Sequence, residues 1–421
     1  MKKTFKRSLV WFSNNLRTQS NQLIQEAINL SESILFVFIV DERQELKNDW
    51  GLSKMGPFRK KHQIDALLDL KQQLQLKGIQ IHIYKGNPTI LIPEICKRNE
   101  IEIIFKQFDF AHDEIQDNEL IFNKSGIKIK FIDDNYLIPI HELGFPLQKL
   151  PDVFTQFRIS VEKNMPVFNK PNLIQLSDCD VLIDENTGEF NVIQSESTEK
   201  VNGETRALSH LKTYIESGHA RHYKETRNGL INDSDSTKLS TFLAMGCLNA
   251  KTVMYHIREH ENEFGANEST YWIWFELLWR DYFRNVSAKF GKKIFLQNGI
   301  KHQTNKKKFN PELFKKWTLG ETGEAFVDAN MKELLQTGWM SNRGRQNVAS
   351  YWIHDLNMDW RPAAAWFEHQ LIDYDVYSNY GNWIYLAGVG NDPRPNRKFN
   401  IKKQAEQYDP QGEYVRKWLK K

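Results

Sequence analysis

The stretch from Leu371 to Arg394 concentrates side chains that could do chemistry. Little more than a dozen of its residues hold two carboxylates, an amide and two aromatic rings: Asp373, Asp375, Asn379, Trp383 and Tyr385. Glycines interrupt the stretch, and glycine is common where backbone must turn or approach a ligand closely. Apolar residues alone would predict a core helix here. Carboxylates interleaved with tryptophan and glycine indicate instead the wall of a pocket that holds a flat polar ligand.

An anion site is predicted at Ser236–Leu248, which reads STKLSTFLAMGCL. Hydroxyl groups and one lysine precede an apolar helix here, and the backbone N–H groups that begin a helix attract negative charge. Such a site suits a pyrophosphate. The alternative is a plain helix start, with Ser240 as the capping residue and no ligand.

A nucleic-acid contact is predicted at Ser269–Arg284, which reads STYWIWFELLWRDYFR. Helical spacing puts Glu276, Trp279 and Arg280 on one face. A carboxylate and an indole on one face can hydrogen-bond the edge of a base and stack on its ring. The alternative is that Trp279 belongs to the core, as most aromatic stripes do.

Two arginines, Arg343 and Arg345, begin a further helix in the string TGWMSNRGRQNVASYW. An arginine at this point could pair with the carboxylates of 371–394 and lie against the ligand. The alternative for Arg343 is a solvated surface charge. A zinc pattern, H-x-x-E-H, also occurs at His256–His260. Since zinc needs a third ligand and polar residues follow, we expect a solvated helix end there and no metal site.

The composition is that of an intracellular globular protein. The chain has 421 residues, 40% of them hydrophobic and 26% charged, which predicts two domains or one large one. A net charge of +4 permits nucleic-acid binding without requiring it. The three cysteines are odd in number and far apart, which argues against a disulfide framework. Since no apolar run suggests export or a membrane span, we expect a cytoplasmic protein with no membrane contact.

The first 135 residues alternate short apolar runs with helical patterns, the clearest at Phe58–Lys77. This alternation predicts a doubly wound parallel sheet with helices on both faces. No G-x-G-x-x-G follows the first strand, so the domain is Rossmann-like without the glycine fingerprint and an NAD site is disfavoured. The predicted strands are Leu9–Phe12, Ile34–Val40, Ile79–Tyr84, Ile101–Phe105 and Ile127–Ile132.

Two further regions follow. From 136 to 206 prolines break the periodicity, which predicts an interdomain connector over the surface, with a disordered spacer as the alternative for Glu185–Thr205. Residues 207–421 predict an all-α domain. Its expected helices are Ala207–Ser217, Ser240–Ala244, Lys251–His260, Tyr271–Phe290, Pro311–Leu319, Phe326–Thr337, Arg345–Asp355 and Ala363–Leu371.

These segments together resemble cryptochrome DASH, a branch of the photolyase and cryptochrome family. The resemblance covers the C-terminal two hundred residues throughout, with GNWIYLAGVGNDPR, SNRGRQNVAS, VDANM and YDPQGEYVRKWL as its most specific strings. It implies that the helical domain binds FAD. The implied FAD-binding residues are Tyr223, Thr237, Lys238, Leu239, Ser240, Glu276, Arg280, Asn342, Arg345, Asp373, Asp375 and Asn379.

The resemblance also implies roles within that set. Asp375 accepts a hydrogen bond from a flavin ring N–H, and Arg345 paired with Asp373 puts positive charge beside a reduced, anionic flavin. Asn379 matches the residue that faces flavin N5. Plant signalling cryptochromes place an aspartate there, so the asparagine favours repair chemistry over plant-type signalling.

The implied reaction is light-driven electron transfer from reduced FAD to a cyclobutane pyrimidine dimer, which splits the dimer. Glu276, Asn342 and Arg343 would contact the lesion, with Trp279 and Tyr385 on its faces. Tyr385 and Gln346 stand where double-strand repair enzymes carry Trp and Met. Since flipping a dimer out of a duplex costs a few kcal/mol, we expect single-stranded DNA as the substrate.

Two parts of the family pattern differ here. Trp383 and Trp360 match the inner two of three electron-transferring tryptophans, but Lys307 stands at the outer position, for which Trp317, Trp352 or Tyr351 could substitute. The family's antenna, 5,10-methenyltetrahydrofolate, binds a glutamate of an EE pair; here Asp113–Glu114 makes Glu114 the candidate. Ser13 and Asn15 depart from the opening W-F-R-N-D-L-R, which weakens the expected antenna site and domain interface.

Two other functions stay open. The first is a blue-light photoreceptor that binds nucleic acid or a protein partner without repairing DNA, because the family contains both kinds. The second is a light-independent flavoprotein, which Trp360 and Trp383 disfavour. We expect the chain to act as a monomer.

Overall fold

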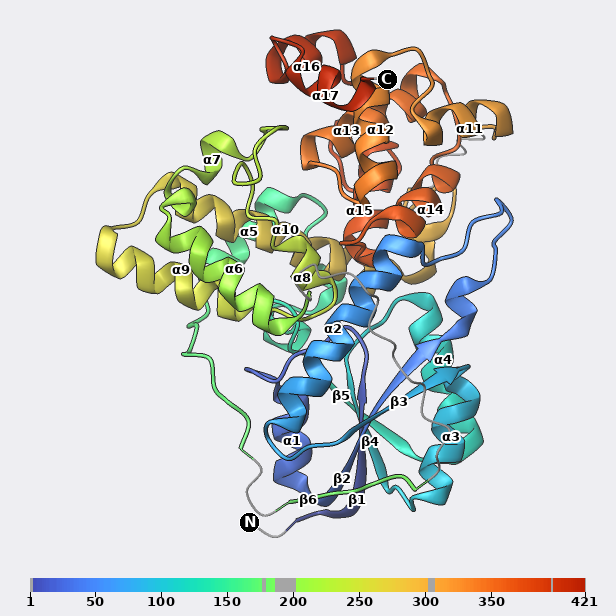
Figure 1. The fold of residues 1–421 in the computed structure, drawn as a ribbon, viewed down its shortest axis with the longest axis vertical. Coiled ribbons are helices and arrows are strands. Elements are labelled where there is room, and N and C mark those ends of the chain that lie inside the picture. The colour runs from blue at the N-terminus through green and yellow to red at the C-terminus, as the bar shows by residue number, and fades with distance from the viewer. Residues whose placement is uncertain (1–2, 176–178, 186–201, 302–306, 395–396, 421) are drawn as a thin grey trace.

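The computed structural model describes residues 3–175, 179–185, 202–301, 307–394 and 397–420. Figure 1 shows a sheet domain at one end and, at the other, two groups of helices, α5–α10 and α11–α17. Most of the acidic spacer predicted before residue 205 falls at 186–201, outside the described residues. Among the residues described, no helix is both long and apolar enough to cross a membrane.

The N-terminal domain is the predicted doubly wound α/β domain. Its strands are parallel in the order β3-β2-β1-β4-β5, and helices cover both faces of the sheet (Figure 1). The strands are β1 (Phe5–Phe12), β2 (Ser31–Asp41), β3 (Ile81–Gly86), β4 (Ile103–Gln107) and β5 (Lys128–Ile132). The helices are α1 (Gln22–Leu30), α2 (Pro57–Gln75), α3 (Pro88–Arg98) and α4 (His112–Ser125).

Burial on both faces explains why these strands were readable from sequence. Val10, Phe36 and Phe105 on one face and Leu9 and Val37 on the other are all fully buried. A strand covered on both sides must be apolar at successive positions, which produces the uninterrupted runs. Strands β1 to β4 extend beyond the predicted runs mainly through polar or charged end residues, β3 and β4 begin two residues later than predicted, and β5 begins one residue later.

The region after β5 is not the surface connector that we predicted. Tyr136, Leu137 and Phe157 are buried, Phe157 on the helix α5 (Phe154–Glu162). Farther along, β6 (Asp180–Val181) pairs with β2, so the chain returns to the sheet. The prolines removed the periodicity from this region although part of it is buried; other apolar residues, such as Val167 and Leu173, are exposed. The division of the chain at 135 and 206 itself stays a prediction.

The C-terminal region is all-α, as predicted. Its helices are α6 (Glu204–Glu216), α7 (Tyr223–Thr226), α8 (Ser240–Ala244), α9 (Ala250–Phe264), α10 (Glu268–Phe290), α11 (Pro311–Leu319), α12 (Ala325–Thr337), α13 (Asn342–Ser350), α14 (Trp360–Gln370), α15 (Val376–Leu386), α16 (Ile401–Tyr408) and α17 (Glu413–Leu419). The predicted helix at Arg345–Asp355 is α13 followed by a π-helical turn, Tyr351–Asp355. Helices α7, α15, α16 and α17 were missed; at α15, the carboxylates that precede the helix and the glycines within and after it resembled a loop.

The two domains meet at the loop after β1. The buried guanidinium of Arg17 donates to Asp134 and Asn135, each at 2.7 Å, and to the carbonyl of Gly246 at 3.2 Å. Gly246 has φ +64°, and a Cβ there would lie 2.0 Å from the carbonyl oxygen of Asn14. This close approach holds the C-terminal end of α8 against the sheet domain. The domains are closely packed at this point, beside Asn15, although Ser13 and Asn15 led us to expect a weaker interface.

Candidate functional site

The helical domain contains a cavity of about 550 Å³ that continues into a smaller one of about 90 Å³. Helices α8, α10, α13 and α15 supply most of the walls. The predicted residues that line the larger part alone are Tyr223, Thr237, Lys238, Leu239, Ser240, Glu276, Trp279, Arg280, Arg343 and Tyr385. Asn342, Arg345, Gln346, Asp373 and Asp375 line both parts, and Asn379 and Trp383 line the smaller one.

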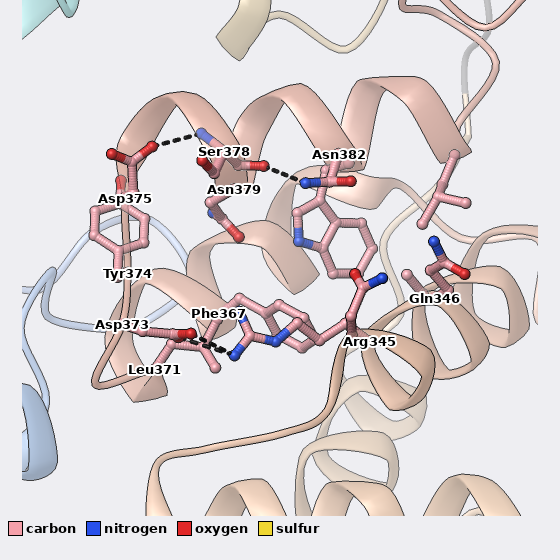
Figure 2. Close-up of a pocket in the computed structure, with 14 residues that line it drawn as sticks. Arg345, Gln346, Phe367, Leu371, Asp373, Tyr374, Asp375, Ser378, Asn379 and Asn382 are labelled. Atoms are coloured by element: carbon pink, nitrogen blue, oxygen red, sulfur yellow. Dashed lines mark hydrogen bonds and ion pairs between the residues drawn. The ribbon is translucent and has the colours of Figure 1, made fainter. Parts of the chain in front are cut away.

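A buried ion pair stands at the junction of the two parts. Arg345 donates to both oxygens of Asp373, at 2.9 and 2.8 Å (Figure 2). Ser240 from α8 donates its hydroxyl to the same carboxylate at 2.7 Å. Asp373 is 6% exposed, and both of its oxygens accept from Nη2 of Arg345, while Nε of the same guanidinium donates to the carbonyl of Met340 at 2.9 Å. The wall of the cavity thus carries a fixed guanidinium, as the pairing predicted from sequence requires.

Helix α15 presents its polar residues to the smaller cavity. Asp375 caps the helix by accepting from the backbone N–H of Ser378 at 2.7 Å (Figure 2). One turn on, the amide of Asn379 donates to the carbonyl of Ala364 at 3.1 Å, which fixes the plane of the amide. The cap explains why a helix begins at this point, since Asp375 supplies the acceptor that the first backbone N–H groups need.

In Ser236–Leu248, the segment predicted to hold an anion, the helix and the lysine are arranged differently from what we expected. Helix α8 is only five residues long and has no side-chain cap, so the plain-cap alternative with Ser240 is wrong. Lys238 has φ +48°, and its ammonium pairs with Asp233 at 2.6 Å and lies 4.6 Å from the ring of Trp339. Lys238 therefore stands at the edge of the cavity with its charge already partnered.

The opposite wall of the larger cavity combines a carboxylate with aromatic rings. Glu276 pairs with Arg227 at 2.6 Å, while burial raises the pKa of its carboxyl and Arg227 partly opposes that rise. Trp279 stacks on Phe154 with ring centroids 3.8 Å apart, and Tyr385 stands nearly perpendicular to it at 5.8 Å. Phe154 covers one face of the indole, and Trp279 lines the cavity.

Arg343 is not the solvated surface charge that was its alternative. Its guanidinium donates to Gln346 and Asn228, each at 3.0 Å, and lies over the ring of Tyr408 at 4.6 Å. Sequence reasoning missed Arg227, which lies in the string YKETRNGL before α8. Its spacing from Glu276 carries no periodic signal, because the two residues meet only through the fold.

The tryptophans considered for electron transfer lie in two groups: Trp383 is followed by Trp317 and Trp352, and Trp360 lies beside Tyr380. Trp383 has its ring 6.4 Å from Trp317, whose ring is 5.4 Å from Trp352. Trp360 does not line the cavity; its indole donates to the carbonyl of Gln297 at 3.1 Å, and its ring lies 6.2 Å from Tyr380. Lys307, half-buried, donates to the carbonyl of Ile353.

A second large cavity, of about 850 Å³, lies between the domains. Glu114 lines it, as does Asp109, which sequence reasoning missed. Burial raises the pKa of Glu114 to about 7 and that of Asp109 to about 6. Two carboxyl groups that titrate near neutrality therefore face one cavity.

The zinc pattern does not assemble a ligand set. Within the described part of the chain, no three His, Cys, Asp or Glu side chains come together as metal ligands would. His260 is buried with its ring 4.8 Å from Phe264, so it belongs to the packing of α9.

Comparison with known proteins places these features in context. A family model described as DNA photolyase matches residues 8–173, and one described as FAD binding domain of DNA photolyase matches residues 272–421. Cryptochrome DASH of Synechocystis sp. is 39% identical over 98% of this chain and 87% of its own length. Cryptochrome DASH of Xenopus laevis is 40% identical over 96% of this chain and 81% of its own.

Solved structures agree with the sequence comparisons. The crystal structure of a Synechocystis sp. cryptochrome is similar with a TM-score of 0.92 and 36% identity, covering 100% of this chain and 89% of the other. A Sulfolobus tokodaii photolyase with two FAD molecules is similar with a TM-score of 0.78 and 25% identity, covering 98% and 90%.

Proposed function

This chain belongs to the photolyase family, in its cryptochrome DASH group, and on that premise we propose that it splits cyclobutane pyrimidine dimers in single-stranded DNA with blue light and FAD. The activity is that of a deoxyribodipyrimidine photo-lyase. One observation carries the proposal: a single cavity brings together a wall suited to a flavin and a wall suited to a nucleic-acid base. Illuminating the reduced protein with dimer-containing oligonucleotides tests it.

The first wall fits a flavin by its chemistry. Arg345 is held by Asp373 at 2.8 Å, so the positive charge is in place before a ligand arrives. A preorganised guanidinium stabilises an anion with little reorganisation. Asp375 and Asn379 follow on one face of α15 and offer an acceptor and an amide to the ring edge. When bound and reduced, FAD supplies one electron to the dimer under light and takes it back after the ring has split.

The phosphates and ribitol of FAD would lie along α7 and α8. Tyr223, Thr237 and Leu239 line the larger cavity there, with Lys238 at its edge. The Lys238 ammonium would have to leave Asp233 to reach a phosphate, and because Asp233 is fully exposed, little energy opposes that move.

The second wall fits a pyrimidine dimer. Trp279 offers one face of its indole because Phe154 covers the other, and Tyr385 stands across from it. Arg227 holds Glu276, and Glu276 with Asn342 and Arg343 can hydrogen-bond the exposed edges of the bases. Gln346 and Tyr385 offer a smaller stacking surface than two large apolar side chains. Weaker binding of the lesion is sufficient for single-stranded DNA, because no base pairs have to be broken there.

The photoreceptor function is the second candidate. It needs the same flavin wall but no lesion contacts, so the Arg227–Glu276 pair beside Trp279 favours repair. Arg394 and Arg397 border the same cavity, where they can contact DNA phosphates. Such contacts make DNA binding weaken steeply as salt rises.

Trp383, which lines the cavity, would be the last donor before the flavin. Trp317 and Trp352 lead away from it at ring distances of 6.4 and 5.4 Å, and because both are fully buried, a further residue would have to connect them to solvent. Any electron transfer that involves Trp360 would instead pass through its neighbour Tyr380.

We also propose that the interdomain cavity holds a 5,10-methenyltetrahydrofolate antenna. Its volume suits a ligand of that size, and Glu114 can accept from the amino group of a pterin. The ionised carboxylate is a much stronger acceptor than the protonated carboxyl group, so the raised pKa of Glu114 makes binding depend on pH.

We expect folate affinity to fall about tenfold per pH unit below pH 7, because each step further protonates Glu114. The measurement is a titration of folate into the purified protein, followed by absorbance, between about pH 8 and about pH 5. Glu114→Gln is expected to bind weakly at every pH. An affinity that stays constant over this range would contradict the role of Glu114.

Two further proposals concern the cellular compartment and the oligomeric state of the protein. Cys96, Cys179 and Cys247 are free thiols, which favours a reducing compartment, and we propose the cytoplasm. We propose that the chain acts as a monomer, because the cavity draws all the residues named for it from one chain.

A further inference from the structure

Tyr136 stands in the wall between the cofactor cavity and the interdomain cavity. Arg280 and Asp375 border both cavities, and Tyr136 borders the interdomain one. Tyr136 comes from the segment directly after β5 and is 3% exposed. A residue outside the helical domain therefore reaches a carboxylate that lines the cofactor cavity.

The hydroxyl of Tyr136 donates to Oδ2 of Asp375 at 3.1 Å. Oδ1 of the same carboxylate accepts the backbone N–H of Ser378 at 2.7 Å (Figure 2). The guanidinium of Arg280 lies 3.7 Å from Oδ2. Both oxygens are held, so the carboxylate has one orientation rather than several.

The ring of Tyr136 is itself fixed between two cations. The guanidinium carbons of Arg280 and Arg284 lie 4.0 and 4.2 Å from its centroid, and Arg284 is anchored by Asp133 at 2.5 Å. Burial raises the pKa of the Tyr136 hydroxyl well above its ordinary value, so the hydroxyl keeps its proton and is the donor. A tyrosine that only filled space in the core would need neither the two cations on its ring nor the hydrogen bond from its hydroxyl.

We propose that Tyr136 is a positioning residue for the flavin: it holds Asp375 so that the carboxylate presents a fixed acceptor to the ring in the neighbouring cavity. This inference rests on the proposed flavin site and deepens it. If Tyr136 served only for packing, phenylalanine would replace it without effect on the flavin.

The test compares Tyr136→Phe with a matched control, Tyr377→Phe. The two rings lie 6.3 Å apart and border the same cavity, but the hydroxyl of Tyr377 accepts from the backbone N–H of Phe110 and does not touch Asp375. We expect Tyr136→Phe to raise the FAD dissociation constant about tenfold, the loss typical of a hydrogen bond to a charged group. We also expect it to shift the flavin absorption maximum and reduction potential. The control should leave all three unchanged.

Two further variants separate positioning from folding. Tyr136→His returns a ring N–H donor and is expected to recover part of the FAD affinity that Tyr136→Phe loses. In an Asp375→Asn background, Tyr136→Phe should have little further effect, because the charged acceptor is already gone. Circular dichroism and thermal melting show whether each variant is folded.

The outcomes are distinct. A folded Tyr136→Phe with wild-type FAD affinity, spectrum and potential overturns the positioning role and leaves the flavin function standing. Effects that simply add in the double variant, or no recovery in Tyr136→His, also overturn it. Wild-type protein that binds no FAD removes the proposed function itself, and with it this inference.

Discussion

Trp383→Phe is expected to abolish light-driven reduction of the bound flavin. Trp383 is buried, lines the smaller cavity and has its ring 6.4 Å from Trp317, so it lies between the proposed flavin site and the indoles of Trp317 and Trp352. Phenylalanine keeps the packing but is much harder to oxidise. The measurement is the bleaching of the blue absorption band of the oxidised flavin during illumination with an external reductant.

The matched control is Trp366→Phe. Trp366 is a partly buried residue of α14. Its ring stacks on His369 and does not border the cavity. The flavin bound to the Trp366→Phe variant should be photoreduced at the wild-type rate. Wild-type photoreduction in Trp383→Phe would show that electrons reach the flavin by another residue.

Asp373→Asn is expected to leave the protein without FAD. The change removes the charge that Arg345 and Ser240 both hold, so the guanidinium is no longer fixed beside the proposed flavin site. Losing hydrogen bonds between charged groups costs about 3 kcal/mol, which corresponds to an affinity about 100-fold weaker. The measurement is the ratio of FAD to protein after purification, followed by titration of the apoprotein with FAD.

Asp328→Asn controls for the loss of a buried carboxylate in general. Asp328 accepts from the backbone of Thr322 and Gly323 at the start of α12, away from the cavity. It should lower stability but retain FAD. Stoichiometric FAD in Asp373→Asn would remove the Arg345–Asp373 pair from the account of flavin binding.

The strands and most helices could be read from sequence because burial imposes a pattern on them, which is an uninterrupted apolar run in the strands and a helical period in the helices. Val37 and Leu9 lie in runs that are apolar throughout, since the sheet is covered on both faces. The site residues could be named because their strings are long and specific. That most of their side chains share one cavity agrees with the resemblance; Trp360 and Glu114 do not line that cavity, and the role of each residue stays a proposal.

What could not be read are the contacts that exist only in three dimensions. Nothing in the spacing of Tyr136 and Asp375, or of Arg227 and Glu276, indicates that these side chains meet. Prolines hid the buried segment that carries Tyr136. In α15 the polar cavity residues outweighed the helical pattern, because one helix serves both the core and the site.

Repair itself is the measurement that tests the account most directly. Reduced, FAD-containing protein is illuminated with one dimer-containing oligonucleotide, presented either as a single strand or in a duplex, and the restored pyrimidines are counted. The account predicts rapid repair of the single strand, slower repair of the duplex and none in the dark. Absence of repair in both substrates, with FAD bound and reduced, would contradict it and leave the photoreceptor function.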